Sequence, residues 1–158
     1  MIKIVCVGKI KEKFFIEAIE EYKKRLSKYT KIQIIEVNDE ENNTLLKEKE
    51  NILKVLNLKD YIITLEIEGT QLSSLELSNK INKTLEINSN ITFIIGGSQG
   101  LHDDIKNLSK FKLSFSKLTF PHQLFRIILL EQLYRSYKII NNETYHKWIK
   151  KIKSSTIK

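Results

Sequence analysis

The chain has 158 residues, of which 41% are hydrophobic and 29% charged, a balance typical of one globular domain and not of a disordered chain. The net charge of +8 fits a polyanionic partner such as nucleic acid or an anionic membrane surface, although a lysine-rich surface also serves solubility alone. A lone cysteine, Cys6, excludes an intrachain disulfide and any metal site built on several cysteines. No apolar run approaches the ~20 residues of a membrane span, and the N-terminus lacks a signal-peptide pattern. We therefore expect a cytoplasmic protein without a membrane segment or a metal.

Strand-like and helix-like patterns alternate along the first third of the chain. Residues 2–8 form an almost continuous apolar run typical of a buried strand. Apolar side chains then recur at helical spacing over residues 14–26, and a second strand is predicted at 32–37. An acidic loop, 39–41, leads into a helix at about 44–56.

The same alternation continues through the middle of the chain. A third strand over residues 61–67 is expected to end at Gly69, and Ser73 or Ser74 can cap the helix that follows. A fourth strand, 91–95, runs directly into the glycine-rich sequence GGSQG. The glycines therefore lie at the carboxyl end of a predicted strand.

The last predicted elements are a short helix, a fifth strand and a long helix. The short helix covers residues 103–108 and the strand 112–115, and Pro121 then opens a helix that runs to about residue 140. Five alternations of strand and helix predict an α/β fold with a mainly parallel sheet and helices on both faces.

Ligands of such sheets bind in loops beyond the carboxyl ends of the strands, here residues 65–69, 96–100 and 115–120. Glycines in the middle loop let backbone N–H groups approach a ligand closely, although the same sequence also suits a plain tight turn. The loop matches neither the Walker phosphate loop nor the GxGxxG pattern.

The start of the long helix carries a histidine and an arginine on one face. His122 and Arg126 are four residues apart, and a hydrogen-bonding ring beside a permanent cation suits an RNA phosphate or a polarised base. The alternative is a partly buried histidine and a solvated arginine on an amphipathic helix. Farther along, Glu131 and Arg135 are expected to form a solvated pair.

The long helix is apolar on nearly every side, which predicts that a partner subunit covers part of it. Arg126 would then lie at the margin of that interface. The apolar residues that cannot all face one core are Leu124, Ile127, Ile128 and Leu130.

The C-terminal region is basic and contains aromatic residues. Residues 138–158 include six lysines and one acid, Glu143. Tyr145, His146 and Trp148 are interleaved with those lysines, a pattern that suits base stacking and phosphate contact. A frayed, solvated tail is the alternative interpretation.

Four segments together are distinctive: IKIVCVGKIKEKFF, ITFIIGGSQGLHDD, LSFSKLTFPHQLFRIILLEQLYRSYKI and ETYHK. They resemble the RlmH family, whose members methylate N3 of a pseudouridine in 23S ribosomal RNA. The resemblance covers nearly all of residues 1–147, interpreted as one SPOUT-type methyltransferase domain. The basic extension 148–158 departs from the family pattern.

The resemblance implies a SPOUT fold with a C-terminal trefoil knot, a homodimer, and S-adenosylmethionine bound within the knot. It further implies that His122, Arg126, Tyr145, His146 and Lys147 engage RNA. We hypothesise that Arg126 stabilises the anion that develops on a base carbonyl during transfer. The proton of N3 would be lost to His122, to a nearby polar group, to a bound water or to the RNA itself. The implied cofactor contacts are Leu65, Gly96, Phe115, Ser116, Lys117, Leu118, Thr119 and Phe120.

Two other functions are compatible with these features. One is a related knotted methyltransferase that acts on transfer RNA, and the other is a non-catalytic ribosome-binding protein with a degenerate cofactor pocket. The intact GGSQG and FSKLTF segments argue against degeneracy, and the absence of an added RNA-binding domain argues against many transfer-RNA enzymes.

Overall fold

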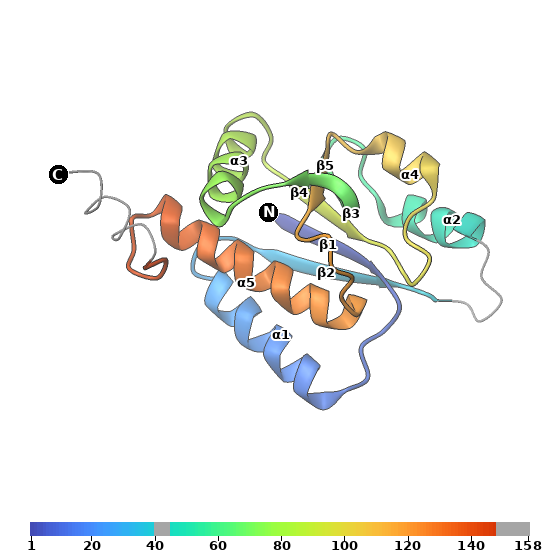
Figure 1. Ribbon diagram of the computed structural model, residues 1–158, viewed down its shortest axis with the longest axis horizontal. Helices are drawn as coiled ribbons and strands as arrows, with labels where there is room; N and C mark the ends of the chain where they lie inside the picture. The colour runs from blue at the N-terminus through green and yellow to red at the C-terminus, as the bar shows by residue number, and fades with distance from the viewer. Residues whose placement is uncertain (40–44, 148–158) are drawn as a thin grey trace.

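The computed structural model describes residues 1–39 and 45–147, and at its centre five parallel strands form a sheet in the order β2-β1-β4-β3-β5 (Figure 1). The strands are β1 (Ile2–Val7), β2 (Ile32–Val37), β3 (Tyr61–Gln71), β4 (Ile91–Ile95) and β5 (Phe111–Ser114). The helices are α1 (Lys13–Leu26), α2 (Leu45–Val55), α3 (Ser74–Ile87), α4 (Asp103–Leu108) and α5 (His122–Ile140). The predicted parallel α/β architecture is confirmed.

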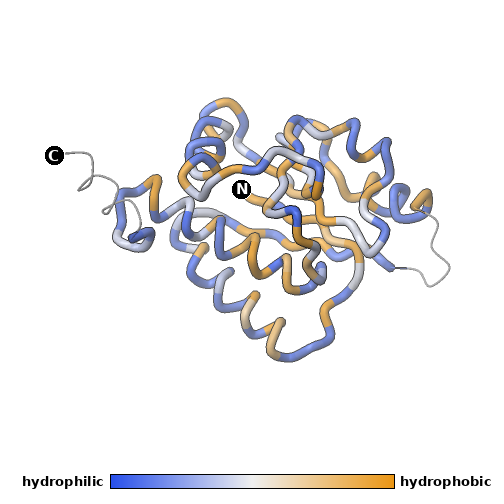
Figure 2. Tube along the Cα trace, viewed as in Figure 1, coloured by the Kyte–Doolittle hydropathy of each residue, from blue (hydrophilic) through white to orange (hydrophobic). Residues whose placement is uncertain are grey.

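Helices cover both faces of the sheet, which explains why its strands are apolar almost throughout. On one face, α1, α3 and α5 pack over a core that includes Phe93 and Leu129. On the other face, α2 and α4 cover a smaller core around Ile94 and Ile105. Figure 2 shows hydrophobic residues gathered along the central strands, between the two helical layers. The neighbours Phe93 and Ile94 enter opposite cores because successive strand residues point to opposite faces.

Cys6 lies in the larger core, on the interior strand β1. Burial raises the pKa of its thiol to about 12, against the lowering influence of the nearby Arg126 cation. The thiol is therefore protonated at neutral pH and is a poor nucleophile. The predicted core role of this cysteine is confirmed.

The third strand differs from its prediction, because β3 continues through Gly69 to Gln71. Leu65 and Thr70 both pair with Leu113 of β5, so the four residues between them bulge out of the ladder. A Cβ on Gly69 would lie 2.8 Å from the carbonyl of Lys112. Gly69 therefore permits a close crossing of β3 over β5, and the prediction that it ends the strand was wrong.

The boundaries of two helices follow from their first residues. Ser73, and not Ser74, caps α3, through a reciprocal pair of hydrogen bonds with Glu76. Pro121 has an extended conformation and precedes α5, whose first residue is His122. Over the described ranges, 1–39 and 45–147, no helix is long and apolar enough to cross a membrane.

The amino-terminal edge of the sheet is held by a buried carboxylate, Asp60. Its Oδ2 accepts hydrogen bonds from Lys3 Nζ at 2.7 Å and from Thr92 Oγ1 at 2.8 Å. Burial alone would raise the pKa of Asp60, but these hydrogen bonds and the Lys3 charge outweigh it and hold the pKa below its usual value. This network fixes the strands at the edge opposite the candidate site.

Candidate functional site

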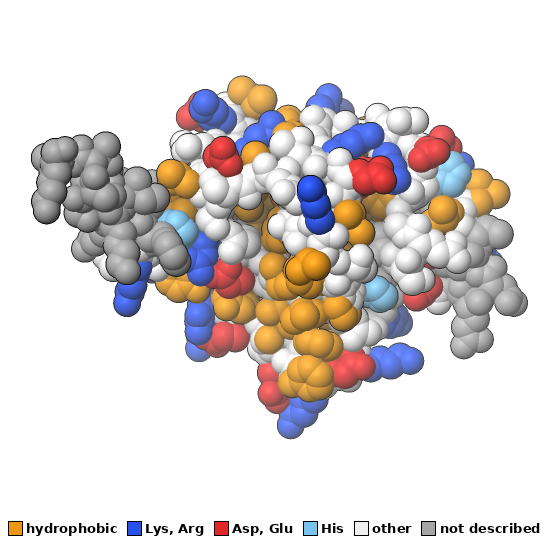
Figure 3. All heavy atoms as spheres, in the orientation of Figure 1, with side chains coloured by type: hydrophobic (Ala, Val, Ile, Leu, Met, Phe, Trp, Pro, Cys, Tyr) orange, Lys and Arg blue, Asp and Glu red, His pale blue; other side chains and the backbone are white. Residues whose placement is uncertain are grey.

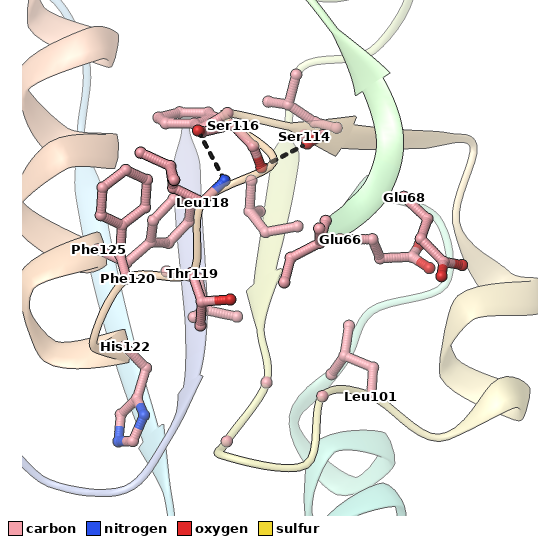
Figure 4. Close-up of a pocket in the computed structure, with 18 of the residues that line it drawn as sticks. Glu66, Glu68, Leu101, Ser114, Ser116, Leu118, Thr119, Phe120, His122 and Phe125 are labelled. Atoms are coloured by element: carbon pink, nitrogen blue, oxygen red, sulfur yellow. Dashed lines mark hydrogen bonds between the residues drawn. The ribbon is translucent and has the colours of Figure 1, made fainter.

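A cavity of about 350 Å³ lies beyond the carboxyl ends of β3, β4 and β5 (Figure 4). Three segments form most of its wall: the bulge of β3, the glycine turn after β4, and the loop between β5 and α5. These are the three loops that the strand-end rule selected from the sequence. Parallel strands place their carboxyl ends at one edge, so segments far apart in the chain meet there.

The bulge of β3 supplies two carboxylates, Glu66 and Glu68. Figure 4 shows them on the wall opposite Phe120 and Phe125. Glu66 is nearly buried, and its Oε2 accepts a hydrogen bond from Thr64 Oγ1 at 2.6 Å. The bulge therefore places negative charge at the wall of a cavity in a protein that is basic overall.

Lys106, on α4, forms an ion pair with Glu66 of this acidic wall. Its Nζ lies 3.8 Å from Oε1 of Glu66, and Lys106 itself lines the cavity. Sequence reasoning included Glu66 in the loop 65–69 but named neither Glu66 nor Lys106 as a site residue, and it did not predict the bulge, because the run 61–67 was interpreted as an unbroken strand. The glycine within a polar stretch, EGTQ, was the available signal of a bulge.

The glycine turn after β4 folds back on itself. Gly97 and Gly100 form an isolated bridge, with Gly100 N donating to Gly97 O at 3.1 Å, and Gly100 has a φ of +78°. A Cβ on Gly96 would lie 2.5 Å from the carbonyl oxygen of Gly100. Gly96 is therefore required by the close packing of the turn against its own backbone.

The loop between β5 and α5 is organised by serines and aromatic rings. Ser116 Oγ accepts a hydrogen bond from Leu118 N at 3.0 Å, which fixes the turn that presents Leu118. Phe125, in the first turn of α5, packs edge-on against Phe115 and stacks on Phe120. The apolar wall of the cavity is thus anchored to the long helix.

Most of the residues implied as cofactor contacts gather in this one cavity. Lys117 is the exception, since it does not line the wall. Those in the wall are Leu65, Gly96, Phe115, Ser116, Leu118, Thr119 and Phe120.

His122 and Arg126 have different environments although they share a helix face. His122 lines the cavity. Arg126 is only 1% exposed and does not line it. Its guanidinium donates to Glu36 Oε2 at 2.7 Å and, through Nη2, to the carbonyls of Val7 and Gly8. Arg126 is therefore buried within its own chain with Glu36 as its ionic partner, and the alternative interpretation of a solvated arginine was wrong.

The buried guanidinium ties α5 to the carboxyl ends of β1 and β2. Glu36 also accepts a hydrogen bond from Ile10 N at 3.0 Å, so one carboxylate joins the segment after β1 to the helix. His122 lies one turn before Arg126 on α5. Arg126 thus fixes the position of His122 without lining the cavity itself.

The C-terminal residues with an implied RNA role pack against the far end of α5. Tyr145 donates its hydroxyl hydrogen to Glu131 Oε1 at 3.2 Å, and Arg135 also donates to that oxygen. Arg135 Nη1 lies 3.1 Å from His146 Nδ1. Because a guanidinium has no acceptor, Nδ1 accepts this bond and a neutral His146 carries its proton on Nε2. Glu131 and Arg135 pair as predicted, and in addition they bind the C-terminal segment through Tyr145 and His146, which the sequence did not predict.

Within one chain, this segment is distant from the cavity. The 19 residues of α5 separate the two, which corresponds to about 28 Å along the helix axis. Lys147 is exposed, and the extension 148–158 lies outside the described residues.

Comparison with known sequences gives a consistent result. A family described as "Predicted SPOUT methyltransferase" matches residues 1–146. The ribosomal RNA large subunit methyltransferase H of Caldicellulosiruptor saccharolyticus is 50% identical over 154 residues, which cover 93% of this chain and 100% of that relative. The protein of the same name from Clostridium tetani is 50% identical over 157 residues, which cover 92% of this chain and 99% of that relative.

Among solved structures, a probable methylase family protein from Haemophilus influenzae Rd KW20 has a TM-score of 0.55 and 16% identity. The match covers 92% of this chain and 70% of that protein, and at this identity it bears on the fold alone. The family match spans nearly the whole chain and agrees with the motifs and the sheet. The chain belongs to the SPOUT methyltransferase family and, within it, to the RlmH group that its motifs predicted.

Proposed function

We propose that this protein transfers a methyl group from S-adenosylmethionine to N3 of a pseudouridine in 23S ribosomal RNA, in the cytoplasm and on the assembled 70S ribosome. The observation that carries the proposal is the cavity at the carboxyl ends of β3, β4 and β5, in a chain of this family. Relatives that share half of its residues are named ribosomal RNA large subunit methyltransferase H. The fold is proposed to include the trefoil knot of the family.

The residues of the cavity fit this cofactor in polarity and charge. Leu65 and Phe115 offer apolar surface for an adenine ring, and Ser116 offers a polar group beside them. The carboxylates of Glu66 and Glu68 suit the positive charges of a sulfonium and an amino group. Bound there, the cofactor would supply the methyl group of its sulfonium, and the rest of the cofactor would be the leaving group, a neutral thioether.

The chain's own contribution to transfer is positioning and control of one proton. The imide N3–H of the acceptor base must lose its proton for N3 to attack, and methyl transfer of this kind gains most from alignment of the reactants. His122, at the wall of the cavity, is the proposed proton acceptor. Arg126 is proposed to act through the placement of His122, because its guanidinium is buried and bonded to Glu36.

A homodimer is proposed from the apolar surface that one chain leaves open. Figure 3 shows hydrophobic side chains crossing one face of the molecule over α1 and α5. Phe14 is 64% exposed, Leu118 70% and Leu124 37%. Since α5 separates Tyr145 and His146 from the cavity of their own chain, a second copy is the proposed means of bringing such residues near a cavity.

The test is transfer of label from S-adenosylmethionine to four separate acceptors: 70S ribosomes, free large subunits, naked 23S RNA and transfer RNA. Label chiefly in 70S ribosomes is the expected result. Label in transfer RNA would identify a transfer-RNA methyltransferase instead. Ribosome binding without transfer of label would identify a non-catalytic protein.

A further inference from the structure

We infer that a second, polar cavity beside the first binds the sugar–phosphate backbone of RNA next to the methylated nucleotide. This inference rests on the proposed function. The cavity measures about 390 Å³ and lies beyond the carboxyl ends of β1 and β2, at the same edge of the sheet as the first. The two cavities thus occupy neighbouring parts of the edge at which parallel sheets bind ligands.

The walls of the two cavities differ in a way that matches the two parts of a nucleotide. The first includes Phe115, Phe120 and Phe125, which suit flat, apolar rings. The second has no apolar side chain in its wall, among the residues that the structure describes. Its side chains are those of Lys9, Lys11, Asn38, Asp39, His122 and Gln123.

The charge of the second cavity favours an anion. Lys9 and Lys11 are exposed, and within residues 1–39 and 45–147 neither forms an ion pair. Among the residues that the structure describes in this wall, Asp39 is the one acid, so two described cations face one described anion. The Asp39 carboxylate and the amide of Asn38 can bond to ribose hydroxyls, while the lysines neutralise phosphates.

The segment that carries the two lysines is held in place by buried bonds. Arg126 Nη2 donates to Gly8 O at 2.7 Å, and Glu36 accepts from Ile10 N at 3.0 Å. The backbone on both sides of Lys9 is therefore tied to β2 and α5. A backbone that is already held loses less conformational freedom on binding than a mobile one, so the segment presents its two lysine side chains from a fixed base.

His122 joins the two cavities, because it lines both. Its Nε2 lies 4.0 Å from the point that a Cβ on Gly8 would occupy. Gly8 has a φ of +87°, a conformation that favours glycine, so backbone without a side chain stands beside the imidazole. A nucleotide whose base enters the first cavity past His122 would leave its backbone in the second.

The experiment compares two double variants that lose the same charge. Lys9→Gln with Lys11→Gln removes the proposed phosphate contacts. Lys31→Gln with Lys59→Gln removes two exposed lysines at the amino ends of β2 and β3, at the opposite edge of the sheet. Wild type and both variants are assayed for methylation of 70S ribosomes, for naked 23S RNA binding at several salt concentrations, and for S-adenosylmethionine binding.

For the Lys9/Lys11 variant, the KM for ribosomes should rise about tenfold with kcat within about twofold, since the contacts bind RNA in the ground and transition states alike. The slope of log affinity against log salt should become shallower by about 1.4, for two phosphates on a single strand. Binding of S-adenosylmethionine should not change, and the Lys31/Lys59 variant should resemble wild type in KM.

Equal KM values and equal salt slopes for the two variants would overturn the inference. That outcome is distinct from failure of the proposed function, which would appear as absence of methylation by wild type. The RNA-binding slopes decide the role of the second cavity in either case.

Discussion

Gly96 lies where the wall of the first cavity meets the backbone of its own turn. The 2.5 Å approach to Gly100 O means that any side chain must displace the turn. We expect Gly96→Val to weaken S-adenosylmethionine binding by more than about tenfold. The valine side chain would push the glycine turn out of place, and this displacement would change the cavity wall whether or not the ligand contacts the valine. Calorimetry measures the affinity, and thermal unfolding checks that the variant is folded. Unchanged affinity in a folded variant would place the cofactor elsewhere.

Asp60 is the residue whose ionisation should affect stability most clearly. It is 1% exposed and bonded to both Lys3 and Thr92. Asp60→Asn should lower the free energy of unfolding by about 2 kcal/mol at neutral pH, since it removes charged hydrogen bonds from a buried site.

The pH dependence of that difference follows from the lowered pKa of Asp60. The stabilisation is fully present above the unfolded pKa of about 3.9 and is lost as the pH falls through the lower folded pKa. Urea unfolding curves of wild type and variant should therefore converge in acid. Curves that stay parallel down to low pH would show that the charge of Asp60 is not the cause.

At the scale of elements, α5 connects the cavity at its first turn to the C-terminal segment at its last. Glu131 accepts hydrogen bonds from Tyr145 and Arg135, and Arg135 in turn contacts His146. Glu131→Gln should loosen residues 143–147, reduce methylation of ribosomes about tenfold and spare S-adenosylmethionine binding. Hydrogen exchange measures the loosening, and single-turnover transfer measures the methylation.

Glu17→Gln is the matched control for that variant. Glu17 forms an exposed pair with Lys13 on α1, at 3.7 Å, and exposed pairs of this kind contribute little. The control should resemble wild type in both measurements. Equal behaviour of the two variants would mean that Glu131 does not position the C-terminal segment.

The elements themselves could largely be predicted from the sequence, because buried strands and amphipathic helices have strong periodic patterns. The β3 bulge could not, since Ile67 continues the apolar alternation while the backbone leaves the ladder at Glu66. The environment of Arg126 was also hidden, because its partner Glu36 lies 90 residues earlier on another strand. Contacts of this kind depend on the tertiary arrangement and have no local signature.

The surface of the whole molecule predicts self-association. Phe14 and Leu118 are mostly exposed and Leu124 of α5 is 37% exposed. Leu130 and Ile127, expected to need a partner subunit, instead pack in the core of their own chain. Light scattering at micromolar concentration should give twice the chain mass of 18.6 kDa. Leu124→Asp should shift the protein toward a single chain, because it puts a charge on the proposed interface. A single-chain mass for wild type would contradict the prediction.

Features of the whole molecule were the least accessible to residue-level reasoning. The alternation of strands and helices, the charge and the three loops indicated a ligand site and an anionic partner. The methylated atom and the knot came with the resemblance alone, because periodicity carries no information on threading. Lys9 and Lys11 were visible in KIKEK after the first strand, but only the fold places them beside His122.

The most direct test of the account identifies the methylated nucleoside. Ribosomes that lack the modification are incubated with the protein and labelled S-adenosylmethionine, and the 23S RNA is digested and analysed by mass spectrometry. The account predicts one labelled product, N3-methylpseudouridine, that is formed by wild type and lost with Gly96→Val. Label on another nucleoside, or no label in 23S RNA, would contradict it.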